Sequence, residues 1–381
     1  AMTELQALRD AYRQHKAALL ASLQAQGAST RGIHVLLRKF SRLADGLLTT
    51  LWQRAGLPPG LTLAAVGGFG REQLFPHSDI DVLVLQPTDL PAPDTVREQV
   101  EAFIRSCWDA GLEIGSSVRS VEECLSEAAN DVTVQTSLLE ARRICGDAAL
   151  FARFEHQFGA QLDPHAFLVA KTLEMRQRHT KHENTPYALE PNCKESPGGL
   201  RDLHLILWVA RAAGLGKRWD ELAHSGLATP YEVRQIQRNE ALLFLIRARL
   251  HAMAGRREDR LVFDLQTAVA ESFGYRSQTP EGARFPLRAS ETLMRRYYWA
   301  AKAVTQLSQI LLLNIEERLN PPTQAPQPIN ARFLDKNGLI EVASDDLYQR
   351  DPHAILETFL LYQSSTGLQN LSARTLRALY N

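Results

Sequence analysis

The sequence predicts an α+β protein, in which a small α/β domain is flanked by N-terminal helices and by a helical-bundle domain. Two observations lead to this prediction. Near-continuous apolar runs at 61–66 and 80–86 are typical of strands that are covered on both faces. On either side of this region, apolar residues recur at three- and four-residue steps, which is the period of amphipathic helices.

Two helices are expected before the strands. Thr3 and Gln6 have the spacing of a capping box, so the first helix should begin there. A second helix should follow Ser29 and end near the Gly-Leu-Pro-Pro segment at 56–59. These helices make up the predicted N-terminal part, residues 1–57.

The predicted α/β domain comprises residues 58–160. Its apolar runs predict strands, and the amphipathic stretches between and after them predict helices. The expected strands are 61–66, 80–86 and 112–121, and the expected helical segments are 94–111, 121–129 and 131–144.

The rest of the chain is expected to be mainly helical. Residues 161–320 should form a bundle that includes a long helix over 291–319, where apolar side chains fall on one face. Residues 321–381 begin with a Pro-rich linker, continue with a hairpin whose turn is Asn337-Gly338, and close with two short helices. We expect this last part to lead to an absent C-terminal half.

Composition excludes several classes of protein. Among 381 residues, 43 Lys and Arg balance 43 Asp and Glu, so the basic excess of a bulk nucleic-acid binder is missing. The four cysteines form no CxxC pair and have no His at zinc-ligand spacing, which favours reduced cysteines in the cytoplasm. The most apolar run, LSQILLLNI, is too short to span a membrane. The sequence leaves the oligomeric state open.

The stretch GGFGREQLFPHSDIDVLVL combines features that suit nucleotide chemistry. The glycine pair Gly67-Gly68 after a strand lets the backbone approach a ligand closely, because no Cβ intervenes. Asp79 and Asp81 are two residues apart on a strand and therefore point to the same side. Such a pair can hold Mg²⁺ together with substrate phosphates. Two ions so held can clamp both oxygens of a displacement at phosphorus.

A simpler interpretation of each piece must be weighed. Asp79 is also what a turn or helix cap before a strand would contain. Asp81 lies between Ile80 and Val82, so we expect it to be buried, and an unpaired buried carboxylate is costly. The whole combination of strand, glycine pair and paired aspartates therefore favours a metal-dependent site.

Three cationic side chains are candidate nucleotide ligands. Lys194 and Arg201 surround a Pro-Gly-Gly turn that opens a helix, a plausible anion site that would belong to the helical domain. The alternative is a structural turn in which Arg201 pairs with Asp202 or Glu195. Arg71 has a similar alternative, which is to pair with the carboxylate of Glu72 next to it.

Two stretches together resemble a known family. The segment GGFGREQLFPHSDIDVLVL looks like the active-site motif of the polymerase-β-like nucleotidyltransferases. The segment YALEPNCKESPGGLRDLH, residues 187–204, is similar to a signature of the bacterial PII uridylyltransferase/uridylyl-removing enzymes. Further similarity lies at 133–147, 255–266 and 351–363, so that the resemblance spans nearly the whole chain.

This resemblance implies transfer of UMP from UTP to a tyrosine of the PII signal protein, with release of pyrophosphate. It implies that Gly67 and Gly68 bind the nucleotide phosphates and that Asp79 and Asp81 bind Mg²⁺, with two ions expected. Ser78 is a further candidate phosphate donor. UTP is thus the expected substrate and PII the expected partner.

The chain departs from the family pattern at two positions of this region. Family members often have Gly-Glu after the arginine, where this chain has Glu72-Gln73. The third carboxylate of the superfamily is also not obvious, and Glu113 and Glu140 are the candidates. We favour Glu140 as a catalytic residue, because Arg142 beside it would keep it ionised.

The family's C-terminal half, with a phosphohydrolase and two ACT domains, has no counterpart in this sequence. No His-Asp dipeptide occurs, so uridylyl-removing activity is expected to be absent. Two other functions remain open. One is nucleotidyl transfer to a small-molecule acceptor, and the other is a non-catalytic module that binds PII or nucleotide.

Overall fold

The strands β1 to β4 of this α+β protein form one mixed sheet, in the order β3-β2-β1-β4, in the computed structural model. β1 pairs antiparallel with β2 and with β4, whereas β2 and β3 are parallel. The strands are β1 (Thr62–Ala65), β2 (Ile80–Leu85), β3 (Ile114–Arg119) and β4 (Arg142–Gly146). The structure describes residues 3–321, 323–364, 368 and 370–381.

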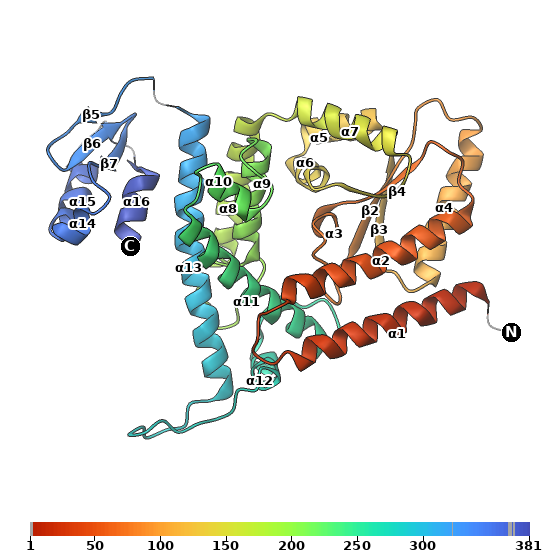
Figure 1. Ribbon diagram of the computed structural model, residues 1–381, viewed down its shortest axis with the longest axis horizontal. Coiled ribbons are helices and arrows are strands. Elements are labelled where there is room, and N and C mark those ends of the chain that lie inside the picture. The colour runs from red at the N-terminus through yellow and green to blue at the C-terminus, as the bar shows by residue number, and fades with distance from the viewer. Residues whose placement is uncertain (1–2, 322, 365–367, 369) are drawn as a thin grey trace. The chain divides into compact units, whose positions relative to one another are not determined.

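The sheet belongs to the first of two compact units, which is assembled from Ala1–Asp163, Tyr187–Lys194 and Glu240–Tyr298. Helices surround the sheet: α1 and α2 lie side by side, and α2 also contacts α4 and β4 (Figure 1). The helices that lie wholly in this unit are α1 (Glu4–Ala25), α2 (Ile33–Ala55), α3 (Gly67–Gly70), α4 (Pro93–Asp109), α5 (Val121–Asn130), α6 (Val132–Leu139), α7 (Ala148–Gln161) and α12 (Phe263–Ser272).

Local chemistry explains where several of these elements begin. The hydroxyl of Thr3 accepts the amide N–H of Gln6, and the Gln6 side chain accepts the N–H of Thr3, which confirms the expected capping box of α1. The helix expected after Ser29 is confirmed as α2, which begins at Ile33 after Gly32 in the left-handed region and ends before Gly56. The strands expected at 61–66, 80–86 and 112–121 are confirmed as β1, β2 and β3, within two residues at each end.

The helix expected over 131–144 is wrong in its second half. α6 ends at Leu139, and β4 follows along the open edge of β1. A backbone segment that satisfies the free N–H and C=O groups of an edge strand can override helical periodicity. Gly146 closes this strand at φ +91°, where a Cβ would come 2.5 Å from the carbonyl oxygen of Leu61.

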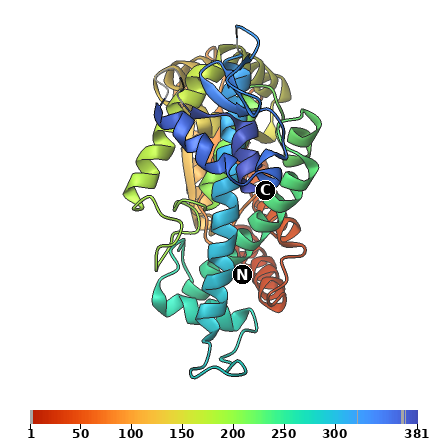
Figure 2. The same ribbon diagram turned by 90° about the vertical axis from the view of Figure 1, so that its left-hand side faces the viewer.

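The second unit comprises Pro164–Pro186, Glu195–Asn239 and Trp299–Asn381. Its helical part agrees with the prediction from sequence. The long α13 is an unbroken helix of 31 residues, and like α11 it contributes residues to both units (Figure 2). The helices are α8 (Pro164–Lys181), α9 (Leu200–Ala212), α10 (Trp219–His224), α11 (Pro230–Ala254) and α13 (Ala289–Leu319). The division of the chain at 57, 160 and 320 stays a prediction.

The Pro-Gly-Gly turn before α9 is held by a buried carboxylate. Asp202 accepts hydrogen bonds from the backbone N–H of Gly198 (2.8 Å), from Arg178 (2.6 Å) and from His179 (2.8 Å). Gly198 has φ +81°, and a Cβ there would collide with the backbone of Ala301. Asp202 is thus engaged by Arg178 and His179, and it holds the turn to α8.

The described residues after the linker form a small α/β module. The predicted hairpin is confirmed: Asn337 and Gly338 join β6 to β7 with φ values of 53° and 83°. Where the sequence predicted two short helices, the described part contains α14, α15 and α16, which pack around a core that includes Phe333 and Ile340. The elements are β5 (Gln327–Pro328), β6 (Phe333–Lys336), β7 (Leu339–Val342), α14 (Leu347–Arg350), α15 (Ala354–Ser364), β8 (Asn370–Leu371) and α16 (Ala373–Tyr380).

Two further expectations concern the chain as a whole. Within the described residues, no helix has both the length and the apolar character needed to cross a membrane. All four cysteines have free thiols, and burial raises the pKa of Cys107 to about 12.

The pairing of Asp202 yields a stability prediction. Burial raises the pKa of this carboxyl, but the hydrogen bond from His179 and the charge of Arg178 outweigh burial, so the pKa lies below its ordinary value. Asp202→Asn should lower the free energy of unfolding at neutral pH by about 3 kcal/mol, since it leaves Arg178 without its carboxylate. Denaturant unfolding of parent and variant measures the difference.

The sign of the pH dependence follows from the lowered pKa. The stabilisation is fully present above the unfolded carboxyl's pKa and is lost as the pH falls through the lower folded one, so the difference should begin to shrink near pH 4 and vanish only below the lowered pKa of Asp202. Asp89→Asn, on an exposed loop, is the control and should behave as the parent at every pH. A difference that persists unchanged in acid would show that the Asp202 charge is not the cause.

Candidate functional site

The paired aspartates lie at the start of β2, at the centre of the first unit's sheet. Asp79 immediately precedes the strand and Asp81 is its second residue. The carbonyl of Asp81 accepts the N–H of Val66 at 3.0 Å, which aligns Asp81 with the end of β1. Asp81 therefore lies beside the glycine pair, as the sequence pattern predicts.

Two glycines leave space around the Asp81 carboxylate. Gly115 is its register partner on β3, and a Cβ at position 115 would come 2.6 Å from Oδ1 of Asp81. A Cβ on Gly67, whose φ is +60°, would lie 3.8 Å from Oδ2. Gly68 follows directly, with its Cβ direction facing Arg71. The carboxylate thus faces bare backbone on two sides, and on the Gly115 side it occupies space that a larger residue would fill.

The expected burial of Asp81 is wrong. The residue is exposed, while the other five residues of β2 are buried. Partial desolvation and then the neighbouring charge of Asp79 raise its pKa above the ordinary value, and the charges of Lys194 and Arg257 oppose this shift. Among the described residues, none donates a hydrogen bond to its side chain. A cation bound beside Asp81 would offset the repulsion from Asp79 that contributes to this raised pKa.

Asp79 already has a cationic partner, which reasoning from the sequence missed. Its Oδ2 accepts a hydrogen bond from Nη1 of Arg257 at 2.5 Å, and both side chains are more than half exposed. Arg257 lies 178 positions further along the chain. It belongs to the stretch at 255–266 that resembles the family, and that resemblance is the signal that could have found it.

A buried network holds the loop before Asp79. The backbone N–H of His77 donates to Nδ1 of His251 at 3.2 Å, and the other ring nitrogen of His251 lies 2.9 Å from Asp259. Arg247 donates to the same carboxylate at 2.7 Å. The carbonyl of Asp259 accepts the N–H of Cys193, next to Lys194. The segments that carry Arg257 and Lys194 are therefore tied to the aspartate loop.

Lys194 and Arg201 belong to different units. Lys194 lies in the unit of the aspartates, where its charge lowers the pKa of Asp81. Arg201 lies at the start of α9 in the second unit, with its guanidinium 5.6 Å from the ring centroid of Trp208. The structure thus brings Lys194 near the aspartates, and a role for Arg201 in binding phosphate stays a prediction. Ser78 is the last residue of the loop before Asp79 and is half-buried.

Glu140 and Arg71 form a buried ion pair. Nη1 of Arg71 donates to Oε1 of Glu140 at 2.5 Å, and the Glu140 side chain is only 5% exposed. The expectation that Arg142 serves Glu140 is wrong, since Arg142 donates to Asp45 at 2.7 Å. Glu113 precedes β3, and its carbonyl accepts the N–H of Ile80. Glu140 and Glu113 both remain candidates for the third carboxylate.

The donor set suits a metal ion that is held jointly with a ligand. Within the described residues, no group of three or more His, Cys, Asp or Glu is arranged to bind a metal. Asp79 and Asp81 supply two exposed carboxylates beside bare glycine backbone, which fits Mg²⁺ completed by phosphate oxygens and water. A structural zinc site would need a closed set of four ligands.

Glu72 explains the departure from the family pattern. It follows α3 in the left-handed region at φ +60°. A non-glycine residue is strained there, which is why glycine suits this position. The Glu72 carboxylate lies 3.5 Å from Arg38 and 3.8 Å from Arg142, so the side chain gains ion pairs in exchange.

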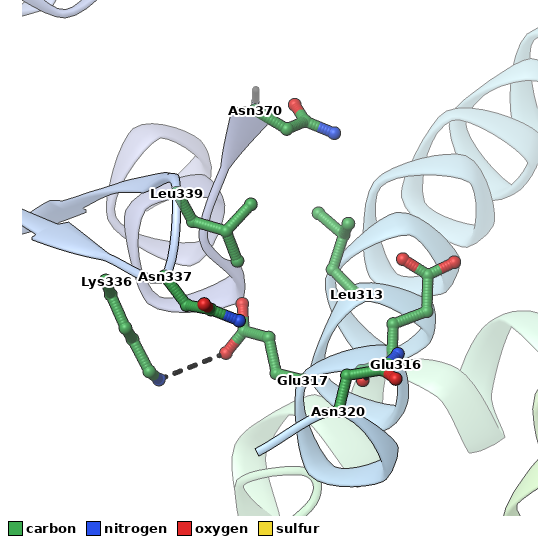
Figure 3. A pocket seen from close by; sticks show the side chains of 8 residues that line it. All are labelled: Leu313, Glu316, Glu317, Asn320, Lys336, Asn337, Leu339 and Asn370. Atoms are coloured by element: carbon green, nitrogen blue, oxygen red, sulfur yellow. Dashed lines mark hydrogen bonds and ion pairs between the residues drawn. The ribbon is translucent and has the colours of Figure 1, made fainter. Parts of the chain in front are cut away.

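The C-terminal module borders a cavity of about 380 Å³, next to the end of α13 (Figure 3). Its charged groups satisfy one another. Lys336 lies 3.2 Å from Glu317 and 3.5 Å from Glu341, and Glu317 also accepts the N–H of Ala373. Burial raises the pKa of Glu316, which adjoins Glu317 on α13. The described residues that line this cavity include neither a glycine nor a pair of exposed carboxylates, so they do not repeat the aspartate site.

An exposed aspartate pair beside a glycine turn, with cationic side chains nearby, suits a phosphorylated ligand that binds together with a metal ion. Comparison with known proteins makes this specific. The family model described as GlnD PII-uridylyltransferase matches residues 166–312, and the model described as uridylyltransferase GlnD third domain matches 333–381. The chain belongs to the GlnD family of uridylyltransferases.

The alignments with similar proteins include the aspartate site as well. Proteins of Burkholderia mallei (strain ATCC 23344) and Burkholderia pseudomallei (strain K96243), both named bifunctional uridylyltransferase/uridylyl-removing enzyme, are 58% identical over 363 residues. These alignments cover 95% of this chain and 41% of each relative. The chain thus spans less than half the length of the relatives that it matches.

The strained Glu72 yields a second prediction. Glu72→Gly should raise the free energy of unfolding by up to about 1 kcal/mol, because the relief of left-handed strain exceeds two long, half-exposed ion pairs. Glu72→Ala removes the same carboxylate and keeps the strain, so it serves as the control and should not stabilise. Denaturant unfolding measures both. Stabilisation of equal size in the two variants would indicate that the carboxylate, and not the backbone, is the source of the strain.

Proposed function

We propose that this chain is a polymerase-β-like nucleotidyltransferase that transfers UMP from UTP to a tyrosine of the PII signal protein and releases pyrophosphate. One observation supports it most: the exposed Asp79 and Asp81 lie at the start of β2, and the Asp81 carboxylate faces the bare backbone of Gly67 and Gly115. The choice of UTP as nucleotide and of PII as acceptor follows from the names of the matching family model and of the relatives. The proposal includes a cytoplasmic location and no nucleic-acid substrate.

The aspartates hold Mg²⁺ in this proposal, with one or two ions shared between them and the phosphates. Bound metal supplies charge neutralisation and lowers the pKa of an oxygen that it contacts. Asp79 and Asp81 orient it, and the backbone at Gly67 and Gly68 admits the β- and γ-phosphates. Lys194, Arg71 and Arg201, with the Ser78 hydroxyl, are the proposed phosphate ligands.

The reaction forms one P–O bond and breaks another. The tyrosine oxygen of PII attacks the α-phosphorus, and the bond to the β-phosphate oxygen breaks, so that pyrophosphate leaves. The hydroxyl proton has an ordinary pKa near 10 and needs an acceptor as the bond forms. Glu113 and Glu140 are the proposed acceptors: Glu113 precedes β3, which pairs with β2, and Glu140 is held by Arg71 just after the glycine turn.

A second candidate is a module that binds nucleotide or PII without turnover. The ion pair between Asp79 and Arg257 favours it, because the arginine occupies a position that a metal ion would need. Turnover separates the two functions. We also propose that the chain lacks uridylyl-removing activity, since its sequence contains no His-Asp dipeptide.

The first test removes a metal ligand. Asp81→Asn should lower the rate of UMP transfer from labelled UTP to PII by at least about 100-fold, since even residues that merely orient metal ligands are worth 10- to 100-fold. Asp89→Asn makes the same chemical change on an exposed loop and should leave the rate unaltered. Transfer by Asp81→Asn at the parent's rate would refute the metal assignment. Nucleotide binding without transfer in the parent would favour the non-catalytic module.

The second test concerns the cation on Asp79. Arg257→Ala should lower the Mg²⁺ concentration for half-maximal transfer up to about fivefold, because an exposed ion pair that competes with the metal is worth at most about 1 kcal/mol. Arg256→Ala changes the neighbouring arginine, which pairs with Glu258, and should leave the Mg²⁺ requirement unaltered. If Arg257→Ala instead raises the KM for UTP at saturating Mg²⁺, the arginine binds the phosphates.

A further inference from the structure

A cavity of about 480 Å³ opens in the first unit next to the aspartates. The first helix, the end of α4 and the loops before β2 and β3 form its walls. The lining side chains that matter here are Arg9, Arg13, Lys16, His77, Trp108 and Glu113.

The cavity adjoins the reaction centre through two of its residues. His77 is two positions before Asp79 in the same loop. Glu113 directly precedes β3, and its carbonyl accepts the N–H of Ile80 at 3.3 Å, between the two aspartates in sequence. A molecule that fills the cavity therefore lies alongside the segment that carries the catalytic carboxylates.

The charge of the cavity is mainly positive. Arg9 and Arg13 are exposed, and Lys16 is half-buried. Within the part of the chain that the structure describes, none of the three forms a hydrogen bond or an ion pair through its side chain. Several other arginines of this unit do have carboxylate partners, as Arg142 has in Asp45. Cationic side chains without carboxylate partners that line one cavity are suited to an anionic ligand.

The cavity also has an apolar wall. Trp108 is 53% exposed at the end of α4, although large aromatic side chains are usually covered. Exposed tryptophan and arginine are the residue types that contribute most to binding between proteins. Apolar and cationic groups together fit an acidic polypeptide better than a free phosphate, which would gain nothing from the indole.

We propose that this cavity binds an acidic segment of the acceptor protein, next to the tyrosine that receives UMP. The proposal rests on the proposed function and adds how the acceptor is recognised. Arg9, Arg13 and Lys16 pair with carboxylates that flank the acceptor tyrosine, and Trp108 packs against an apolar side chain of the same segment. The tyrosine hydroxyl then reaches the α-phosphate from the side of His77 and Glu113.

Charge reversal tests the proposal. Arg9→Glu/Arg13→Glu should raise the KM for PII by at least about tenfold and leave kcat and the KM for UTP within about twofold of the parent. Lys39→Glu/Arg105→Glu is the matched control: it changes the net charge equally, at exposed positions of α2 and α4 outside the cavity, and should change none of the three constants. An unaltered KM for PII, or a raised KM for UTP alone, would overturn the proposal.

A binding measurement separates this proposal from the proposed function. Equilibrium binding of PII to the parent chain should weaken with salt and weaken further in Arg9→Glu/Arg13→Glu. Lysine in place of the acidic residues that flank the PII tyrosine should restore binding to that variant and weaken binding to the parent. If the parent binds PII in this way without transferring UMP, the proposed function fails while the docking site stands. Equal binding of PII by parent and variant refutes the docking site, whatever the turnover.

Discussion

The candidate site depends on the register between β2 and β3. This register places Gly115 directly beside Asp81, and a side chain there would meet Oδ1 of the carboxylate, since even a Cβ would come within 2.6 Å. On the other edge of β2, the bond from Val66 to the Asp81 carbonyl aligns the end of β1. A slip of one residue would turn Asp81 to the opposite face of the sheet and bring a larger residue beside it.

Charge balance is the second constraint on the site. Asp79 and Asp81 repel each other, and their repulsion contributes to the raised pKa of Asp81. Lys194 and Arg257 oppose it from segments that are distant in sequence, and the Asp259 network holds both segments in place. The non-helical segments around Lys194 and Arg257, which return to the first unit, thus have an electrostatic role at the aspartate site.

Sequence patterns predicted the elements that depend on local chemistry. The capping box of α1, the first three strands and the Asn337-Gly338 hairpin follow from side chains within a few residues. Reasoning failed where distant partners decide: β4 forms because β1 offers an open edge, although its residues have helical spacing. The pairing of Glu140 with Arg71, and not with nearby Arg142, depends likewise on the fold.

The aspartate site shows the same division between local and distant causes. The spacing of Asp79 and Asp81 predicts that they share one side of a strand, and the structure places them at the start of β2. Their exposure was not predictable, because it depends on the absence of side chains at Gly67 and Gly115 in adjacent segments. Arg257 was equally hidden, 178 positions from its partner.

The arrangement of charges bears on which form of nucleotide the site admits. Under the proposed function, a free triphosphate would be attracted by Lys194 and Arg257 but repelled by both aspartates, of which Asp81 faces the glycine backbone proposed to receive it. A metal-complexed triphosphate reverses the repulsion, because the aspartates then become ligands. Arg257 must leave Asp79 in this process, and as an exposed side chain it can do so at little cost in free energy. The resting ion pair is therefore consistent with a site that opens for the metal complex and stays closed to the free nucleotide.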